Sequence, residues 1–472
     1  MKSMQEKEKR ILILLTTSLS SFLTPFSSSI ITFALPRIGE YFRADFFKVV
    51  WIPLAYLIPL PTLMILFGRL SDIYGRVKMF RLGLVVYTAA MILAPFSPSI
   101  YFLIIFNFIA GVGGALLGTN STAIISHVFP AEKRGSALGI NAMSVYLGLT
   151  FSPFLGGILI EFFNWQSIFY ITVPVSLTSL IISFFTMKNI EYMNKKEKLD
   201  VLGAVVFTAS LLSIVFYLTF SEIYNFYDTL YLLISGLLLL ILFIYYEGKA
   251  ENPLLDISLF SKNRTFTASN ISAFLNYIST YSIVFVFTIY LQVFLKLPPM
   301  ETGFALVFQP VFMVIFSPIS GRLADKYGSR IMASTGMMII GLSFLILALI
   351  RITSIMDIVI PISFIGIGFG FFTAPNTNAV MGSVERNKYG VASGTLGTMR
   401  FTGQILSITV ASAILSSAIP KNVLLGLFTG AVQKVSVLYV NEFMAGFKTI
   451  MLFSATISFI GAYASLLKNK GT

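Results

Sequence analysis

The 472-residue chain lacks cysteine, has a single histidine (His127) and is only 11% charged. Without cysteine it can form no disulfide, thiolate metal site or cysteine nucleophile, and one histidine cannot build a histidine-rich metal site. The sequence also lacks a Gly-x-x-x-x-Gly-Lys-Ser/Thr loop, which argues against ATP hydrolysis by that route. Because a membrane-embedded enzyme needs clustered acids, histidines or cysteines, we expect no enzyme activity, no metal and no cofactor.

Hydrophobic residues are abundant instead: they make up 56% of the chain, and its mean hydropathy is +0.86. A water-soluble globule of this length needs far more polar surface. About 20 consecutive apolar residues cross a bilayer, and we predict an all-α polytopic protein of the cell membrane, embedded in the lipid bilayer. The fourteen predicted spans are 11–33, 48–67, 79–96, 100–126, 137–160, 166–187, 200–220, 229–246, 266–292, 301–320, 331–350, 355–381, 389–416 and 443–466.

The net charge of +13 is distributed unevenly between the two sides of these spans. If the N-terminus is cytoplasmic, 24 of the 33 lysines and arginines lie in inner segments and seven lie in outer segments. Cytoplasmic loops of membrane proteins carry such an excess of positive charge. We therefore predict that both termini are cytoplasmic, and the basic charge needs no nucleic-acid partner to explain it.

A charged, glycine-punctuated segment between two apolar stretches occurs twice. Gly68–Lys78 reads Gly-Arg-Leu-Ser-Asp-Ile-Tyr-Gly-Arg-Val-Lys, and Gly321–Arg330 reads Gly-Arg-Leu-Ala-Asp-Lys-Tyr-Gly-Ser-Arg. A second pair of loops, Gly135–Gly139 and Gly390–Gly394, also matches. The offsets of the two pairs, 253 and 255 residues, are far longer than a solenoid repeat. We infer that the first six and last six spans are structural copies.

The duplication divides the chain into three predicted parts. Residues 1–187 form a six-helix bundle, residues 188–264 hold two inserted helices with their linkers, and residues 265–472 form a second six-helix bundle. Polar residues and a proline in the linkers are typical of solvated connections.

The repeated charged segments have residue types that suit a moving junction between helices. Glycine permits sharp reversals and close approach of helix ends, and aspartate can accept hydrogen bonds from helix N-terminal amides or pair with arginine. These charges can alternatively serve only to set topology, but the recurrence of the whole pattern favours a latch that opens and re-forms. The predicted cytoplasmic gate comprises Gly68, Arg69, Asp72, Gly75, Arg76, Gly321, Arg322, Asp325, Gly328 and Arg330.

Several motifs resemble those of a known family. Gly68–Lys78 resembles the signature of the major facilitator superfamily between its second and third helices. Phe26–Pro36 aligns with the first-helix pattern of its fourteen-helix drug:proton antiporter (multidrug efflux) group, and Gly148–Gly157 is close to the antiporter pattern Gly-x-x-x-Gly-Pro-x-x-Gly-Gly. The resemblance implies a major facilitator fold and secondary active transport of small molecules.

The fifth span has the predicted helix bend of that pattern, formed by Gly148, Pro153, Gly156 and Gly157. Glycines at helical spacing allow neighbouring helices to approach closely, and proline bends a helix. Close packing and a gating role are both open for these residues.

The fifth-span pattern has one Gly-to-Ser change, at Ser152, and two charged positions of the group's pattern are also replaced. The expected aspartate of the first helix is Ser27, and the expected arginine of the fourth helix is Asn107. Losing both is physically coherent, because losing one would strand a buried charge. All acidic residues fall in loops or at helix ends, with Glu161 the nearest to an exception. Since a proton-driven exporter of cationic drugs usually needs a buried acid, the resemblance leaves the coupling proton open.

Arg400 is the charged residue predicted nearest the middle of a span. Charge at that depth is costly and therefore a functional candidate. Arg400 can hydrogen-bond to carbonyls or to Asn376 and Asn378, or it can face a central cavity and attract an anionic or electron-rich part of a substrate. The predicted substrate-cavity residues are Ser27, Tyr56, Asn107, Tyr290, Gln292, Asn376, Arg400 and Gln404, each of which can instead be a helix–helix hydrogen-bond partner.

These observations predict a monomeric secondary transporter in which two six-helix bundles rock about a site at the middle of the membrane. The expected activity is export of amphiphilic, drug-like small molecules, with a small-molecule substrate, the lipid bilayer and a coupling proton as partners. Two alternatives remain: a proton-independent importer or facilitator of a neutral or anionic solute, and a non-transporting sensor with the same fold.

Overall fold

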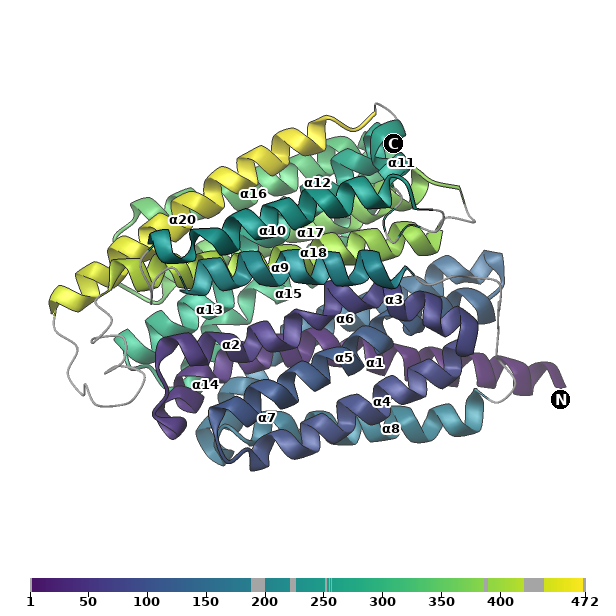
Figure 1. Cartoon of the computed structure of the whole chain (residues 1–472), viewed down its shortest axis with the longest axis horizontal. Helices are drawn as coiled ribbons and strands as arrows, with labels where there is room; N and C mark the ends of the chain where they lie inside the picture. Colours follow the sequence, from purple (N-terminus) through teal and green to yellow (C-terminus); the bar gives the residue numbers. More distant parts are fainter. Residues whose placement is uncertain are drawn as a thin grey trace.

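A computed structural model of the chain describes residues 2–187, 200–220, 226–250, 253, 255, 257–385, 389–419 and 437–469. Nearly all of these residues are helical, and none of them forms a strand. Fourteen helical segments in this part of the chain are long and apolar enough to cross a membrane, which confirms the predicted number. Both termini lie at the same end of the helices (Figure 1). We call it the inner end, because the distribution of positive charge predicts that it faces the cytoplasm.

The first six spans form the N-terminal bundle. They consist of α1 (Lys2–Phe42), α2 (Phe46–Leu57) with α3 (Pro59–Tyr74), α4 (Arg76–Leu93) with the 3-10 turn η1 (Ala94–Phe96), α5 (Ile100–Val128), α6 (Ala131–Phe163), and α7 (Ser167–Tyr170) with α8 (Thr172–Thr186). The next two spans are α9 (Val201–Phe220) and α10 (Phe226–Glu247).

The last six spans form the C-terminal bundle, preceded by the short helix α11 (Ile257–Lys262). They consist of α12 (Arg264–Thr280) with α13 (Ser282–Thr288) and the π-helical turn η2 (Ile289–Phe294), α14 (Pro299–Leu306) with α15 (Phe308–Tyr327), α16 (Ser329–Leu349), α17 (Met356–Gly382), α18 (Tyr389–Ala418) and α20 (Val437–Leu466).

The chain repeats the same turn in both bundles. Gly75 between α3 and α4 has φ 103°, and Gly328 between α15 and α16 has φ 85°, a region that favours glycine. The Gly75 amide donates to Ser71 O at 2.9 Å, and the Gly328 amide donates to Ala324 O at 2.8 Å. The two charged segments recognised in the sequence therefore fold alike.

Proline explains the interruption of two spans near their middle. Pro310 has no amide hydrogen for the helical bond to the carbonyl of Leu306, and α14 gives way to α15 at Val307. In the second span Pro61 removes the equivalent bond, and α2 gives way to α3 at Ile58.

The ninth span is interrupted by a side chain instead. The Ser282 amide donates to the hydroxyl of Ser407 in α18 at 2.9 Å, so it leaves the helical ladder where α12 ends and α13 begins. Tyr281 lies at this interruption.

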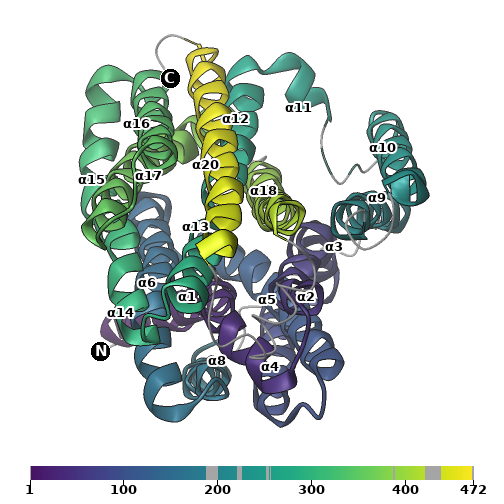
Figure 2. The ribbon, with the colours of Figure 1, turned by 90° about the vertical axis from the view of Figure 1, so that its left-hand side faces the viewer.

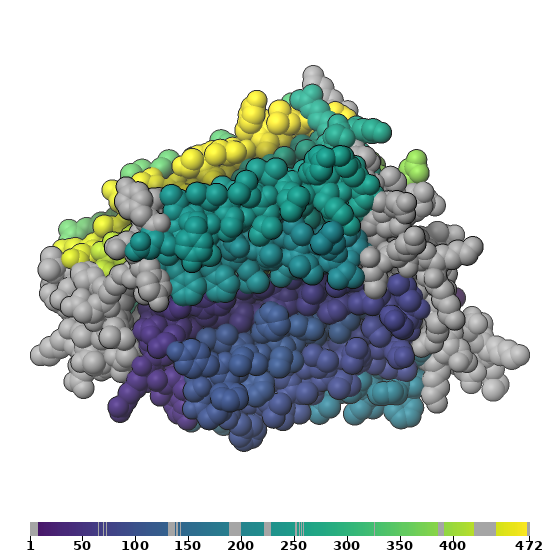
Figure 3. Space-filling model, in the orientation of Figure 1, coloured from purple at the N-terminus to yellow at the C-terminus, as the bar shows by residue number. Residues whose placement is uncertain are grey.

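The inserted helices lie beside the seam between the bundles. Figure 2 shows α9 next to α3 of the N-terminal bundle and α18 of the C-terminal bundle, with α10 on its far side. Trp51 of α2 stacks on Phe216 of α9 with ring centroids 5.1 Å apart, and Phe47 contacts Phe220 at 5.1 Å. In the space-filling view the inserted helices cover the middle of one face, directly against the N-terminal bundle (Figure 3).

The outward surface of α10 is strongly apolar. Tyr231, Leu238 and Ile241 are each more than 60% exposed. A contiguous apolar surface of this kind suits contact with lipid chains rather than water.

Candidate functional site

The outer halves of the two bundles meet backbone to backbone. A Cβ added to Gly157 of α6 would lie 2.7 Å from the carbonyl oxygen of Pro299 and 2.9 Å from the Cα of Met300 in α14. A Cβ added to Gly303 of α14 would collide with the carbonyl oxygen of Pro153. Only glycine allows this approach, so the two residues form a seal between the bundles.

The same seal includes one hydrogen bond between the bundles. Glu161 of α6 accepts a hydrogen bond from the Met300 amide at 3.0 Å. The sequence analysis named this residue as the nearest to an exception among acids that fall in loops or at helix ends.

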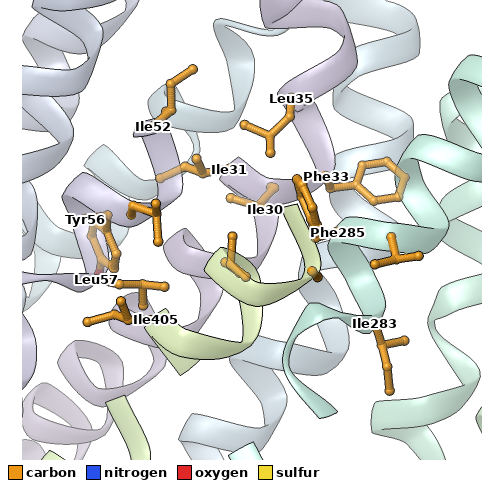
Figure 4. Close-up of a cluster of buried hydrophobic side chains, with 14 of the residues drawn as sticks. Ile30, Ile31, Phe33, Leu35, Ile52, Tyr56, Leu57, Ile283, Phe285 and Ile405 are labelled. Atoms are coloured by element: carbon orange, nitrogen blue, oxygen red, sulfur yellow. The ribbon is translucent and has the colours of Figure 1, made fainter. Parts of the chain in front are cut away.

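Buried apolar side chains close the outer half beside α6 and α14. Phe46 of α2 and Phe285 of α13 bring their ring centroids within 6.0 Å of each other across the seam. Figure 4 shows side chains from α1 and α2 facing those from α13 and α18: Ile30, Ile31, Phe33, Leu35, Ile52, Tyr56, Leu57, Ile283, Phe285 and Ile405. The contact is apolar and buried, and it therefore favours a closed outer side in this conformation.

The other helix-bend residues pack within the N-terminal bundle. Cβ atoms at Gly148 and Gly156 would meet α1, the first at 2.5 Å from Phe22 O and the second at 3.1 Å from Ile30 Cγ1. Of the four residues of the predicted helix bend, Pro153 and Gly157 thus lie against the C-terminal bundle, whereas Gly148 and Gly156 hold α6 to α1.

The predicted cytoplasmic gate lies at the inner ends of α3, α4, α15 and α16. A Cβ at Gly68 would lie 3.2 Å from Thr119 of the same bundle, and one at Gly321 would meet nothing within 4 Å. Arg76 donates to Ala123 O at 3.5 Å, also within its own bundle. Arg322 is exposed and Arg330 is half-buried, while the side chains of Arg69, Asp72 and Asp325 lie outside the described set.

The predicted cavity residues of the N-terminal bundle form hydrogen bonds within that bundle. Ser27, which is 1% exposed, is hydrogen-bonded to the hydroxyl of Tyr87. Tyr56 donates to Thr24 O at 3.1 Å, and Asn107 donates to Leu103 O at 2.8 Å. The amide oxygen of Asn107 has no hydrogen-bond partner.

Tyr290 and Gln292 lie in the π-helical turn near the outer end. The Tyr290 ring stacks on Phe443 with centroids 5.5 Å apart and an interplanar angle of 4°. Both polar atoms of the Gln292 amide are buried without a hydrogen-bond partner. π-Helical turns often occur at functional sites.

Asn376 lies toward the inner end of the C-terminal bundle and bonds there to a residue that follows the last span. Its amide nitrogen donates to Ser269 O at 3.1 Å, and its oxygen accepts from Lys468 Nζ at 2.8 Å. Lys468 follows the last span and is 2% exposed. Burial lowers the pKa of Lys468 to about 7. Asn376 is thus engaged away from Arg400.

Arg400 is half-buried near the middle of α18, and its Nε is buried without an acceptor. Its guanidinium carbon lies 4.5 Å from the ring centroid of Phe401. Where both partners are described, ion pairs join only Arg37 to Glu40 and Lys48 to Asp45, both exposed or half-exposed at the outer end. One turn beyond Arg400, Gln404 also leaves its amide oxygen unpartnered.

Three tyrosines near Arg400 were not singled out from the sequence. The guanidinium interacts electrostatically with the hydroxyls of Tyr146, Tyr277 and Tyr281. Tyr277 and Tyr281 are one turn apart on the ninth span, a spacing that places them on one helix face. That spacing was the available signal. The predicted cavity residues therefore spread from the outer to the inner end, and Arg400 with these tyrosines forms the central group.

Two six-helix bundles in one chain, with interrupted spans and a sealed outer half, define the class of polytopic transport folds. The sequence matches the model of the Major Facilitator Superfamily over residues 17–408 and again over 270–469. The chain belongs to the major facilitator superfamily, and the fold and family identify a transporter rather than an enzyme.

Relatives and solved structures agree with this assignment. The riboflavin transporter RibZ of Clostridioides difficile (strain 630) is 29% identical over 411 residues, which cover 87% of this chain and 88% of RibZ. The multidrug transporter protein MdtP of Bacillus subtilis (strain 168) is 26% identical over 419 residues, covering 87% and 76%. A bacterial homologue of the human lysosomal transporter Spinster, solved inward-facing and unoccupied, shares the fold with a TM-score of 0.66 at 15% identity, covering 97% and 96%.

Proposed function

We propose that this chain is a secondary transporter of the cell membrane that exports amphiphilic, drug-like small molecules by alternating access. The glycine contact between α6 and α14 carries the proposal. Two bundles that meet there through bare backbone, with no side chain interlocked between Gly157 and Gly303, can separate as rigid bodies. Multidrug transporters among the relatives support drug-like substrates.

In this mechanism the outer seal and the inner gate open alternately. The outer seal of α6 and α14 is closed here, whereas Arg322 at the inner end is exposed. When the inner end closes, the two charged segments at the ends of α3 and α15 would act as latches that hold the bundles together. The transporter is proposed to act as a monomer, since each chain has both bundles.

A reversible cross-link tests the proposal. Because the chain has no native cysteine, the pair Glu161→Cys and Met300→Cys can be joined by a short methanethiosulfonate cross-linker without background labelling. We expect the cross-link to stop dye efflux from proteoliposomes and a reductant to restore it. Each single variant, treated identically, is the control. Full efflux by the cross-linked protein would contradict alternating access at this seal.

A second candidate function is proton-independent transport of a neutral or anionic solute. The specific observation is that Arg400 has no acidic partner among the described residues. The relationship to a riboflavin transporter supports it. Dye and riboflavin uptake into inverted vesicles, measured with and without an imposed pH step, separates the two. A response to the pH step favours coupled export, and riboflavin flux without one favours the second function. Binding without any flux would indicate a sensor.

A further inference from the structure

Arg400 is a cation within a membrane span, and no acidic side chain in the described part of the chain pairs with it. Its Nε is buried and has no acceptor, and none of the ion pairs between described residues includes it. A charged side chain at this depth is costly unless a counter-charge or strong hydrogen bonds compensate it. The contact with the Phe401 face, 4.5 Å away, supplies only part of that compensation.

Tyrosines from both bundles surround this cation. Tyr277 comes from α12 and Tyr146 from α6, and both hydroxyls interact with the guanidinium of Arg400. A Cβ added to Gly403, three residues beyond Arg400 on α18, would lie 3.0 Å from the Cβ of Tyr277. The ring of Tyr277 is held edge-on against Phe369, with centroids 5.5 Å apart and an interplanar angle of 83°. The site therefore combines one positive charge with oriented aromatic rings.

Tyr281 completes the group at the interruption between α12 and α13. Its hydroxyl is buried and approaches Ser28 of α1 without completing a hydrogen bond. Tyr146 likewise approaches Thr373 of α17. Each of these tyrosines thus reaches from its own bundle toward the other, so a molecule bound among them would touch both halves of the protein.

The chemistry of the group selects among substrates. Arginine binds carboxylates and other planar anionic groups through a fork of donors, and tyrosine rings stack against flat aromatic systems. An aromatic cation would meet like charge here with no described acid to offset it. An anion without an aromatic ring would pair with Arg400 but would not stack on the tyrosine rings.

We propose that Arg400, Tyr146, Tyr277 and Tyr281 form a binding site for planar aromatic molecules with an anionic edge. The arginine holds the anionic edge, and the tyrosines from both bundles hold the ring. This inference rests on the proposed transport function, because a ligand held by both bundles would be moved across the membrane when the bundles rock.

Binding to the full chain in lipid nanodiscs tests the site without requiring transport. The probes are 2-naphthoate, 2-naphthylmethylammonium and cyclohexanecarboxylate, which vary charge and ring separately. We expect 2-naphthoate to bind at least tenfold more tightly than either of the others. Equal or tighter binding of the ammonium probe would overturn the proposal, even if the protein transports cationic dyes.

Point variants test the preference for an anionic group and the preference for an aromatic ring separately. Arg400→Gln should weaken 2-naphthoate binding at least tenfold, and Tyr277→Leu should remove the preference for the naphthalene ring while keeping that for the anion. Arg351→Gln and Tyr463→Leu change exposed residues of the same types and should bind like the parent. If Arg400→Gln does not fold, Arg400→Lys keeps the charge and should keep the anion preference. Parent-like binding by Arg400→Gln, or loss of the anion preference in Arg400→Lys, would overturn the proposal, whereas binding without flux would contradict only the transport function.

Discussion

The two bundles share a topology but differ in the charge at their centres. In the N-terminal bundle, the positions where the family resemblance implies an acid and an arginine are Ser27 and Asn107, each bonded within that bundle. Among the described residues, the C-terminal bundle instead holds the half-buried Arg400 within a span, and the buried Lys468 lies at its inner end. Both halves have six spans and the same glycine turn, and we propose that the C-terminal half supplies the charge that meets a substrate.

The strongest test of this difference between the bundles is to introduce charge into the N-terminal bundle. Ser27→Asp or Asn107→Arg alone should destabilise the protein by about 3–5 kcal/mol, because each would bury one unpaired charge. The double variant should recover part of that loss if the emptied site still accepts an ion pair. Thermal unfolding in detergent measures all three. If the double variant is no more stable than the less stable single variant, the packing around Tyr87 leaves no room for an ion pair.

Lys468 offers the matching test in the C-terminal bundle. Burial lowers its pKa to about 7, while an unfolded lysine has a pKa of about 10.4. Between these values the unfolded chain binds the proton and the folded protein does not, so stability should rise with pH across this window and be lowest below it. Lys468→Met should flatten the rise, which amounts to at most about 5 kcal/mol at roughly 1.4 kcal/mol per pKa unit.

Chemical denaturation of the parent and the variant between pH 6.5 and pH 9.5 checks this expectation. Lys448→Met is the matched control, because Lys448 lies on α20, the helix that Lys468 follows, but is exposed. An identical pH dependence in the parent and in Lys468→Met would show that Lys468 does not titrate in this range.

The sequence analysis predicted the frame more fully than the site. Long apolar runs need no tertiary information to identify spans, and the paired turns at Gly75 and Gly328 have matching backbone geometry. The partners of polar side chains depend on packing between distant segments. Ser27 meets Tyr87, 60 residues away, and Asn376 meets Lys468, 92 residues away. No local pattern specifies such contacts.

Aromatic residues show the same limit. The chain has 21 tyrosines, and nothing local distinguishes Tyr146 from those that face lipid. Its position near Arg400 follows from the way α6 crosses the seam between the bundles, which depends on the glycine contacts with α14.

A methyl group added to Gly303, on the C-terminal side of the outer seal, tests the contact between the two bundles. In Gly303→Ala the new methyl group would collide with the carbonyl oxygen of Pro153. Overpacking of this kind costs about 1–3 kcal/mol, so the closed outer conformation should become roughly 5- to 150-fold less populated, with efflux reduced accordingly. Labelling of a cysteine at position 161 should become faster. Gly382→Ala, where the methyl group would meet nothing within 4 Å, should behave like the parent; wild-type efflux by both would mean that the bundles do not meet as described.

The smallest expected effect sharpens the comparison at the hydrogen bond between the bundles. Glu161→Gln keeps an acceptor for the Met300 amide but removes the charge that strengthens this bond. A loss of about 1 kcal/mol shifts the opening equilibrium roughly fivefold. The labelling rate of a cysteine at position 300 should rise by that factor. Glu40→Gln removes an acid from an exposed pair within α1 and should change the rate less than twofold. Equal rates in the two variants would indicate that the glycines and the apolar side chains hold the outer seal without Glu161.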